Sequence, residues 1–476
     1  MSKRRRSDTG TRPHRGRPGA TNDSARRRSA PTRSRLLALR VLDRTQRGGA
    51  YADVLLHAEL GRSSLTAQDR AFATELVYGA LRWRGRIDYL LSQVLDRDLE
   101  KVEPPVANVL RLGAYQLVFC DRVPPMAAVD EAVRSVRAAG VERATGFVNA
   151  VLRRLAVEYT TIAPPTLEHD PLSHLTHALS LPPWIAGRWL EVFGKETAAA
   201  LARASNVSPP LTVRVNSRRT SAASLLADLR ERFPEAAACR YARGGIVLGR
   251  RGAPALDPAF IDGRFTVQDE AAQLVVDLLD PQPGERILDA CAAPGGKATA
   301  IAERVGEAGE VVALDRHAGR LDLVCRSARR LGLSNVRYFE RDATQSLADL
   351  VSAAAFDRVL VDVPCSGLGT LRRNPDARWR VAASDPARLA ERQKAILGRA
   401  AAVLRPGGVL VYSTCTLLPE ENEEIVESFL RDASDFGELG CKGLPQEVIG
   451  ADGHLRCLPH VHDTDGFFAA RLERRS

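Results

Sequence analysis

Alternation of short apolar runs with longer helical stretches is the feature that most constrains how the C-terminal half of this chain folds. From about residue 263, runs rich in Val, Ile and Leu recur, each followed by a segment with helical spacing. Strands that alternate with helices pair in parallel, because a right-handed crossover returns the chain to the same end of the sheet. Continuous apolar runs also indicate strands buried on both faces. The sequence therefore predicts a mainly parallel, doubly wound α/β sheet. The expected strands are 286–290, 310–314, 335–339, 358–363 and 408–413.

The residues before this region change in composition from one part to the next. Residues 1–33 are rich in Arg, Ser, Pro and Gly and have too little apolar surface to fold, so we expect a disordered basic tail. Residues 34–164 show helical spacing throughout and predict a compact all-α domain. Residues 165–262 mix strand-like and helix-like runs, and we expect a small α/β segment that bridges to a domain of residues 263–476.

Local signals refine this multidomain map at three places. Ser34 stands at the start of the first helical run as a candidate N-cap. Pro104 and Pro105 mark the start of another helix, since proline is tolerated in a first turn. Near the C-terminus, 455–460 and 466–472 predict an antiparallel hairpin at an edge of the sheet.

The net charge of the chain is concentrated in the tail. The first 35 residues hold twelve Lys or Arg and two Asp, which accounts for the whole formal net charge of +10. One interpretation is an arm that binds nucleic acid phosphates, and the alternative is a solvated leader. No run approaches the roughly 20 apolar residues of a membrane span, and the tail lacks the apolar segment of a secretory signal.

Cysteine and histidine spacing argues against a metal centre. The eight cysteines form no CxxC pair, and the histidines form no HExxH, so we expect no metal site. Free thiols in a chain of this size indicate a reducing cytoplasm. The sequence does not determine the oligomeric state, for which a monomer is the expectation.

A glycine-rich turn follows the first predicted strand in the string RILDACAAPGGK. Gly295 and Gly296 permit a tight turn and close backbone approach to a ligand. Asp315 ends the next strand, where an acid can accept ribose hydroxyls, and Asp342 follows the third, where it could bond a base edge. The string lacks GxGxxG, and Lys297 is followed by Ala, so dinucleotide dehydrogenases and P-loop NTPases are disfavoured. Strand-end caps and a surface lysine are the alternatives.

Two cysteines lie just past predicted strands, in DVPCSG at 362–367 and STCT at 413–416. Carbon 5 of cytosine is too electron-poor to attack a methyl donor, but a thiolate that adds to carbon 6 makes carbon 5 nucleophilic. Cys365 and Cys415 are the candidate nucleophiles, and the residues alone do not choose between them. Asp362 could donate a proton to ring nitrogen 3 if burial raised its pKa. A single strand-end cysteine is more often inert, but two at neighbouring strand ends favour this chemistry.

The segment LRRNPDARWR at 371–380 lies between the two thiols. Arginines with a tryptophan can bind phosphate and stack an unpaired base. A solvated surface loop is the alternative.

These strings together resemble the RNA (cytosine-5) methyltransferases, a family with one cysteine in each of two motifs. ELVYGALRWRGRIDYLL at 75–91 resembles the RNA-binding fold of the antitermination factor NusB, and RVN at 214–216 resembles the small segment that precedes the catalytic domain in such enzymes. The combination is similar to the bacterial Sun/Fmu type, which modifies 16S ribosomal RNA. The matching catalytic strings are VQDEAAQL at 267–274, DACAAPGGKAT at 289–299, DVPCSGLGTLRRNPD at 362–376, YSTCTLLPEEN at 412–422 and DGFF at 465–468.

The resemblance implies a NusB-like RNA-binding domain followed by a Rossmann-like methyltransferase domain that uses S-adenosylmethionine. It implies Cys415 as the nucleophile, Cys365 as an aid to product release, and Asp362 as a contact to the pyrimidine. The 16S rRNA is the expected partner, with no membrane or metal. A transfer RNA substrate and a non-catalytic ribosome assembly factor are the alternatives. The implied cofactor residues are Cys291, Ala292, Ala293, Pro294, Gly295, Gly296, Lys297, Asp315, Asp342 and Asp362.

Overall fold

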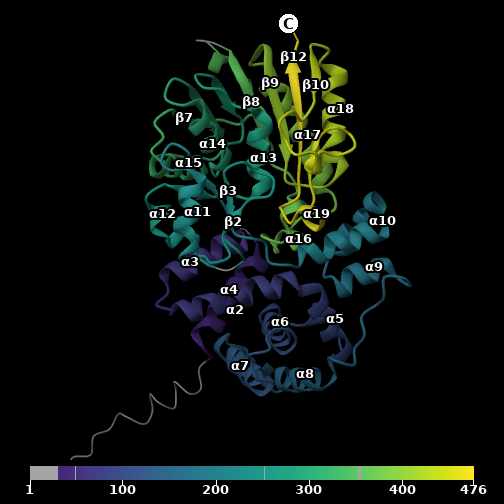
Figure 1. Ribbon diagram of the computed structural model, residues 1–476. Coiled ribbons are helices and arrows are strands. Elements are labelled where there is room, and N and C mark those ends of the chain that lie inside the picture. Colours follow the sequence, from purple (N-terminus) through teal and green to yellow (C-terminus); the bar gives the residue numbers. More distant parts are fainter. Residues whose placement is uncertain (1–30, 49, 251, 352–354, 476) are drawn as a thin grey trace, which may run out of the picture. The chain divides into compact units, whose positions relative to one another are not determined.

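A computed structural model describes residues 31–48, 50–250, 252–351 and 355–475 (Figure 1). The tail predicted at 1–33 therefore lies almost wholly outside the described residues. The chain divides into two compact units. Of the described residues, the first comprises those up to Ala50 with Val54–Val77 and Leu90–Thr161, and the second comprises Tyr51–Asp53, Tyr78–Tyr89 and those from Ile162 onward.

The first unit is helical, as predicted. Helix α6 is buried on nearly every side, and α2, α7 and α8 pack against it. Gly113 of α6 lies against Leu152 of α8, where an added Cβ would lie 2.5 Å from a leucine methyl carbon, so the two helices approach closely. Pro104 begins α6 as expected, but Ser34 is not an N-cap, because α2 begins one residue earlier and Thr32 takes that position. The helices are α2 (Arg33–Arg47), α3 (Ala52–Arg62), α4 (Ala67–Arg82), α5 (Arg84–Val94), α6 (Pro104–Phe119), α7 (Pro125–Ala138) and α8 (Thr145–Glu158), of which α3 to α5 contribute residues to both units.

A small antiparallel sheet stands in the second unit before the main sheet. Its strand order is β2-β3-β1-β4, and β1 pairs with both β3 and β4. Val213, Leu225 and Phe265 are fully buried between this sheet and α11, which gives the segment a core of its own. The elements here are α9 (Pro171–Ser173), α10 (Pro183–Ser205), β1 (Thr212–Val215), α11 (Ala222–Arg230), β2 (Ala237–Ala238), β3 (Gly245–Val247), α12 (Pro258–Ile261) and β4 (Phe265–Val267).

The main sheet confirms the predicted parallel, doubly wound architecture. Its order is β10-β12-β9-β8-β5-β6-β7, and β9 through β7 are parallel neighbours. The chain starts at β5, runs outward through β6 and β7, and then returns to the other side of β5 as β8, so the topological switch point lies between β5 and β8. The strands are β5 (Arg286–Asp289), β6 (Glu310–Asp315), β7 (Val336–Glu340), β8 (Phe356–Asp362), β9 (Leu404–Thr414), β10 (Phe436–Leu439), β11 (Leu455–Cys457) and β12 (Phe467–Arg474).

The predicted C-terminal hairpin is present at an edge of the sheet. Strands β11 and β12 pair antiparallel, β12 also pairs with β9, and β10 pairs with β12 further along the strand. The sequence did not predict β10, because its four residues FGEL carry a glycine and a glutamate and lack a β-branched run.

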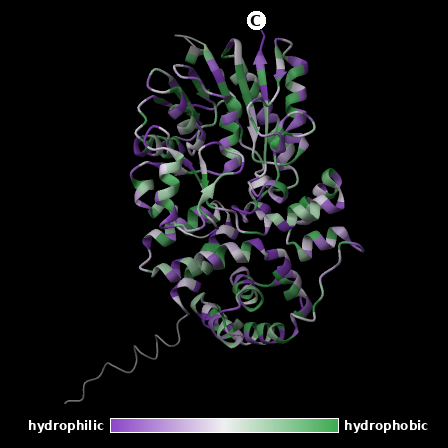
Figure 2. Cartoon of the chain, in the orientation of Figure 1, coloured by the Kyte–Doolittle hydropathy of each residue, from purple (hydrophilic) through white to green (hydrophobic). Residues whose placement is uncertain are grey.

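Successive residues of the main strands are buried on opposite faces of the sheet, so helices cover both faces. Ile287 and Val311 pack into a cluster with α13, α14 and α15, whereas Leu288 and Val312 pack into a cluster with α17 and α18. Figure 2 shows the resulting hydrophobic centre of the sheet, with hydrophilic residues concentrated on the outer helices and loops. The covering helices are α13 (Glu270–Leu279), α14 (Gly296–Val305), α15 (Ala318–Leu331), α17 (Asp385–Ala401) and α18 (Glu423–Asp432).

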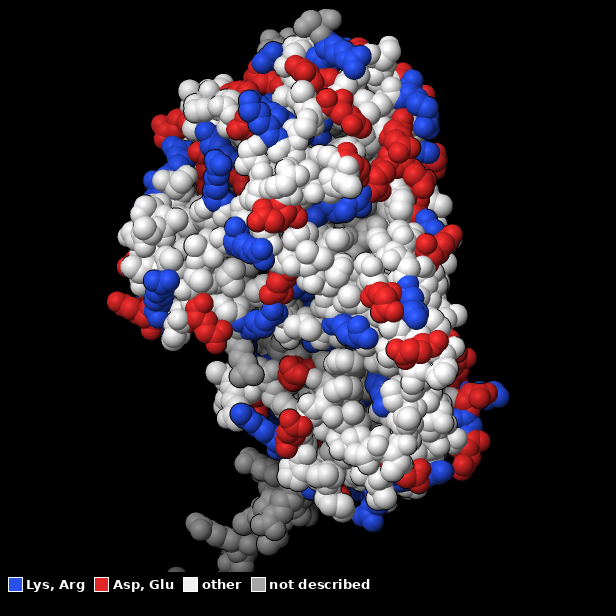
Figure 3. All heavy atoms as spheres, turned by 45° about the vertical axis from the view of Figure 1, so that its right-hand side comes forward, with Lys and Arg blue, Asp and Glu red and all other residues white. Residues whose placement is uncertain are grey.

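The face of the molecule in Figure 3 is mixed in charge. On the face in Figure 3, Lys and Arg side chains stand among Asp and Glu side chains and are separated by uncharged surface. Among the described residues, no helix has the length and apolar character that crossing a membrane requires.

Candidate active site

The two predicted thiols meet at the carboxyl ends of β8 and β9. These strands pair in parallel, with Asp362 opposite Ser413, and each cysteine follows shortly after its strand. The Cys365 and Cys415 sulfurs lie 3.3 Å apart, and both side chains are half-buried. The backbone N–H of Cys415 also donates to Cys365 Sγ at 3.3 Å. The sheet therefore brings together two cysteines that are fifty residues apart in the chain.

The surroundings of Cys365 affect the pKa of its thiol. The hydrogen bond to Cys415 and then burial raise the pKa of Cys365 well above its ordinary value, and the buried carboxyl of Glu421 acts in the same direction. A thiol with a raised pKa keeps its proton, so Cys365 stays a thiol beside Cys415 Sγ. The arrangement suits a reaction in which one sulfur attacks and the other holds a proton beside it.

Asp362 lies at the end of β8 in a pair with Lys297. Lys297 Nζ donates to Asp362 Oδ2 at 2.7 Å, and Ser413 Oγ donates to Asp362 Oδ1 at 2.8 Å. Burial alone would lower the pKa of Lys297, but the charge and hydrogen bond of Asp362 outweigh burial and raise it, with a further contribution from Cys415. Lys297 also lies 4.9 Å from the ring centroid of Phe467. The proton donors at the Asp362 oxygens are therefore an ammonium and a hydroxyl.

The glycine turn after β5 is closely packed against α15. Gly295 has a φ of 109°, and an added Cβ would lie 2.9 Å from the Cα of Val324, so only glycine fits there. Helix α14 begins at Gly296, and Thr299 Oγ1 donates back to Gly295 O at 2.7 Å. The peptide bond before Pro294 is cis. The turn therefore presents backbone directly at the switch point of the sheet.

Carboxyl groups stand at the ends of the three strands beside this turn. Asp315, at the end of β6, accepts from the backbone of His317 at 3.0 Å and lies 3.4 Å from Arg320. Asp342, after β7, accepts from Thr344 N and Oγ1 through Oδ1 only, and these bonds lower its pKa.

Asp289, at the end of β5, is a functional candidate that the sequence analysis did not single out. Burial and then the charge of Asp362 raise its pKa to about 7. Its Oδ2 is buried and has no hydrogen-bond partner among the described residues. A carboxyl within the string DACAAPGGK was the available sequence signal, but its burial and orphaned oxygen follow only from the sheet.

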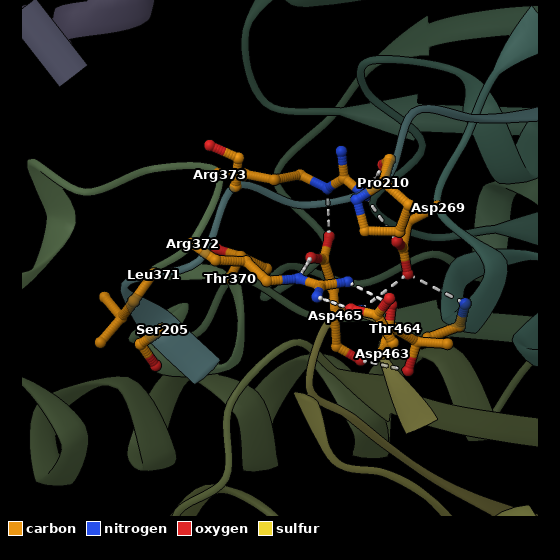
Figure 4. Close-up of polar contacts among 12 residues, drawn as sticks. Ser205, Pro210, Asp269, Thr370, Leu371, Arg372, Arg373, Asp463, Thr464 and Asp465 are labelled. Carbon is orange, nitrogen blue, oxygen red and sulfur yellow. Dashed lines mark hydrogen bonds and ion pairs between the residues drawn. The ribbon is translucent and has the colours of Figure 1, made fainter. Parts of the chain in front are cut away.

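The loops that carry the thiols are joined by backbone contacts and an ion network. Gly369 N donates to Cys415 O at 2.9 Å, and Gly466 N donates to Gly369 O at 2.8 Å. Figure 4 shows Arg373 extended between Asp465 and Asp269, with 2.6 Å to each carboxylate. These contacts tie the loop after Cys365 to the strings VQDEAAQL and DGFF.

Two of the four arginines in the segment 371–380 are buried, contrary to the phosphate-binding interpretation. Arg372 is 1% exposed and Arg378 is fully buried. Arg378 donates to the carbonyls of Arg82 and Ser180 and to Asn206 Oδ1. Asp376 accepts from the backbone of Ala52, and Trp379 Nε1 donates to Leu81 O at 2.7 Å. The segment is a structural junction of the second unit, because its polar groups are used by residues 51–53, 78–89 and 180–206.

Comparisons with known proteins agree with this geometry. The model of the family described as "16S rRNA methyltransferase RsmB/F" matches residues 276–473. The model of the NusB family matches residues 32–157, and that of the "Methyltr_RsmF/B-like, ferredoxin-like domain" matches residues 181–253. The probable ribosomal RNA small subunit methyltransferase B of Synechocystis is 39% identical over 447 residues, which cover 93% of this chain and 99% of the relative.

The chain belongs to the RsmB/F family of 16S rRNA methyltransferases. The ribosomal RNA small subunit methyltransferase B of Pseudomonas putida is also similar, with 36% identity over 439 residues, 92% of this chain and 98% of the relative. The solved structure of PH0851 shares the fold, with a TM-score of 0.78 and 24% identity over 92% of this chain and 98% of that one. This RsmB/F member is thus an S-adenosylmethionine-dependent rRNA methyltransferase with a NusB domain and a Rossmann-like catalytic domain.

Proposed function

We propose that this protein methylates carbon 5 of one cytosine in 16S rRNA through a covalent bond between Cys415 Sγ and carbon 6. The observation that carries the proposal is the pair of sulfurs 3.3 Å apart at the ends of β8 and β9. A single thiol is enough to attack the base, so the second sulfur needs a different role. A covalent adduct must both form and break down, and each of these two steps can use one of the sulfurs.

Cys415 is the thiol that suits attack. Its sulfur lies 3.3 Å from that of Cys365, which keeps its proton, and the Lys297 ammonium interacts with it. The thiolate is the reactive form of a cysteine nucleophile. When the sulfur bonds carbon 6, the ring becomes an enamine and electron density moves to carbon 5. The Asp362–Lys297 pair lies at the same strand end, where its ammonium can donate to the polar edge of the ring.

The residues after β5, β6 and β7 fit S-adenosylmethionine, which supplies the methyl group from its sulfonium when bound. The orphaned Asp289 Oδ2 is an acceptor suited to an ammonium, such as that of the methionine part. Asp315 is placed to accept ribose hydroxyls, and Asp342 has an oxygen available for a base edge. The backbone of 291–297 forms the turn between them, and Lys297 in this turn pairs with Asp362.

Release reverses the addition. Carbon 5 loses its proton to a base, the bond between carbon 6 and Cys415 Sγ breaks, and the electron pair returns to the sulfur. Cys365 donates its S–H to that departing sulfur across the 3.3 Å contact, which stabilises the leaving thiolate. This role accounts for the raised pKa of Cys365, because a donor must keep its proton until release.

The remaining parts of the chain are assigned to RNA recognition. We assign 34–164 to RNA binding and 165–262 to a bridge before the catalytic domain of 263–476, supported by the family matches at 32–157 and 181–253. The names of the relatives support 16S rRNA as the substrate.

The proposal is tested by trapping the adduct. Purified Cys365→Ala is mixed with 16S rRNA and S-adenosylmethionine and then run on a denaturing gel. We expect a retarded band that contains protein and RNA, and its absence when Cys415→Ala is added to the same chain. Nucleoside analysis of the wild-type product should show 5-methylcytidine. Methylation at another atom, or a trapped band that survives Cys415→Ala, would overturn the assignment.

A further inference from the structure

A buried carboxylate, Glu421, lies directly behind the two cysteine loops. Its side chain is 0% exposed although the residue belongs to a turn after β9. Its Oε2 accepts from the backbone N–H of Ser366 at 2.8 Å and from Gln393 Nε2 at 3.0 Å, and its Oε1 accepts from Ser366 Oγ. These partners are neutral donors, and burial raises the pKa of Glu421 while the bonds from Ser366 and Gln393 oppose the shift.

The contacts of Glu421 bracket Cys365 on both sides. Ser366 follows Cys365 and is held by the carboxylate itself. Pro364 precedes Cys365, and its carbonyl accepts from the same Gln393 Nε2 at 3.0 Å. Both neighbours of the thiol are therefore anchored to one buried pair of side chains, Glu421 and Gln393.

Cys415 is held differently. It directly follows β9. The last two residues of this strand, Ser413 and Thr414, pair with Ala469 and Phe468 of β12. Its carbonyl accepts from Gly369 N at 2.9 Å. Cys415 thus follows directly on a strand of the sheet, although Thr416 after it also bonds Glu421, whereas both neighbours of Cys365 are held by Glu421 and Gln393. The two loops touch through Ser366 Oγ and Thr416 Oγ1, which are 2.7 Å apart.

We propose that Glu421 is a positioning residue that holds Cys365 against Cys415 Sγ for the release step. The inference rests on the proposed function, because it assigns a device to one half of that reaction. Glu421 touches neither thiol and acts through the backbone of Ser366. Loss of its acceptor oxygens leaves the N–H groups of Ser366 and Gln393 unpaired, and the loop can then move to find new partners. Attack by Cys415 would continue, but release would slow.

The test uses variants of the full chain that separate an acceptor from a charge. Glu421→Met has similar length and no strong acceptor, so we expect turnover to fall about tenfold and the covalent protein–RNA band to accumulate as in Cys365→Ala. Glu421→Gln keeps a carbonyl oxygen for the two N–H donors, and we expect it to stay within about threefold of wild type. Binding of 16S rRNA, measured by filter retention without cofactor, should not change in either variant.

Glu420→Met is the matched control, because the adjacent glutamate pairs with Arg188 at 2.8 Å on the partly exposed surface. It should turn over normally and form no band. Gln393→Met is the second route to the same loop and should also accumulate the band, which keeps the test decisive if Glu421→Met does not fold. Circular dichroism melting of each variant identifies a general loss of structure, which lowers adduct and turnover together.

The outcomes separate this inference from the proposed function. Turnover at the wild-type rate without a band in both Glu421→Met and Gln393→Met, while Cys365→Ala still traps, would overturn the positioning role alone. Failure of Cys365→Ala to trap would instead remove the release step on which the inference rests. A band in Glu421→Met that disappears on adding Cys415→Ala is the result the inference predicts.

Discussion

Two segments contain residues of types that commonly bind ligands, 291–297 and 371–380, but the fold uses them differently. The first is a turn at the switch point, where Asp289 Oδ2 has no partner among the described residues. The second carries four arginines and a tryptophan, but Arg378 is fully buried and Trp379 donates to Leu81 O. Residue types therefore show what a segment can bind, whereas the polar groups that the fold leaves without a hydrogen-bond partner show what it is able to bind in the folded protein. The predictions below challenge that distinction, from the largest expected effect to the smallest.

Replacing Arg378 tests whether the second segment is structural. Burial and then the charge of Arg82 lower the pKa of Arg378 to about 9, and its donors bond only uncharged oxygens. We expect Arg378→Met to lower the free energy of unfolding by about 3 kcal/mol, because several buried acceptors lose their donor. Urea denaturation measures the change. Arg399→Met, on the exposed side of α17, is the control and should cost less than about 0.5 kcal/mol. Equal stability of the two variants would contradict a structural role.

Replacing Lys297 tests whether the first segment is functional. Lys297→Met removes the ammonium from Asp362 and from the surroundings of Cys415. We expect methyl transfer to fall about 100-fold, since a preorganised charge at the reacting atoms is lost. Single-turnover transfer of labelled methyl groups gives the rate. Lys394→Met, which loses only an exposed pair with Glu391, should react like wild type. Full activity of Lys297→Met would remove the lysine from the mechanism.

Asp289 connects the first segment to a pH dependence of stability. Its pKa is raised from 3.8 to about 7, so between these values the folded protein holds a proton that the unfolded chain has released. This contribution is complete below about pH 4 and is lost as the pH rises through about 7. We therefore expect Asp289→Asn to gain on wild type between pH 5 and pH 8 by on the order of 2 kcal/mol, measured by urea denaturation without cofactor. Parallel profiles for the two proteins would show that Asp289 does not titrate in this range.

The tail gives the smallest expected effect. Residues 1–35 carry the whole net charge, while the face in Figure 3 is mixed in sign. If the tail contacts phosphates, a chain that starts at residue 34 should bind 16S rRNA with a flatter salt dependence than the full chain. We expect this flatter slope from filter binding at several salt concentrations, with unchanged turnover at saturating RNA. An unchanged slope would favour the solvated leader.

The sequence predicted the sheet and the thiols because those signals are local. A buried parallel strand reads as an apolar run, so five strands were located to within a few residues, and each cysteine was placed at a strand end. The 3.3 Å contact between Cys365 and Cys415 then follows from the pairing of β8 with β9. Edge strand β10 was missed, since four residues with a glycine carry little pattern.

The missing parts of the site depend on distant partners. Asp376 accepts a hydrogen bond from the backbone N–H of Ala52, 324 positions away in the chain. The residue pattern near 376 does not predict that contact. Glu421 looks like one of several surface acids in LPEENEE until its donors on Ser366 and Gln393 are seen. Such residues are visible only when the fold brings separate strings together.

The most direct test of the central claim is transfer of labelled methyl groups from S-adenosylmethionine to separated 16S, 23S and transfer RNA, with Cys415→Ala run beside the wild type. The account predicts label at carbon 5 of cytosine in 16S rRNA only, and none with Cys415→Ala. Label in 16S rRNA that persists with Cys415→Ala would contradict the proposed nucleophile, and label confined to transfer RNA would contradict the proposed substrate.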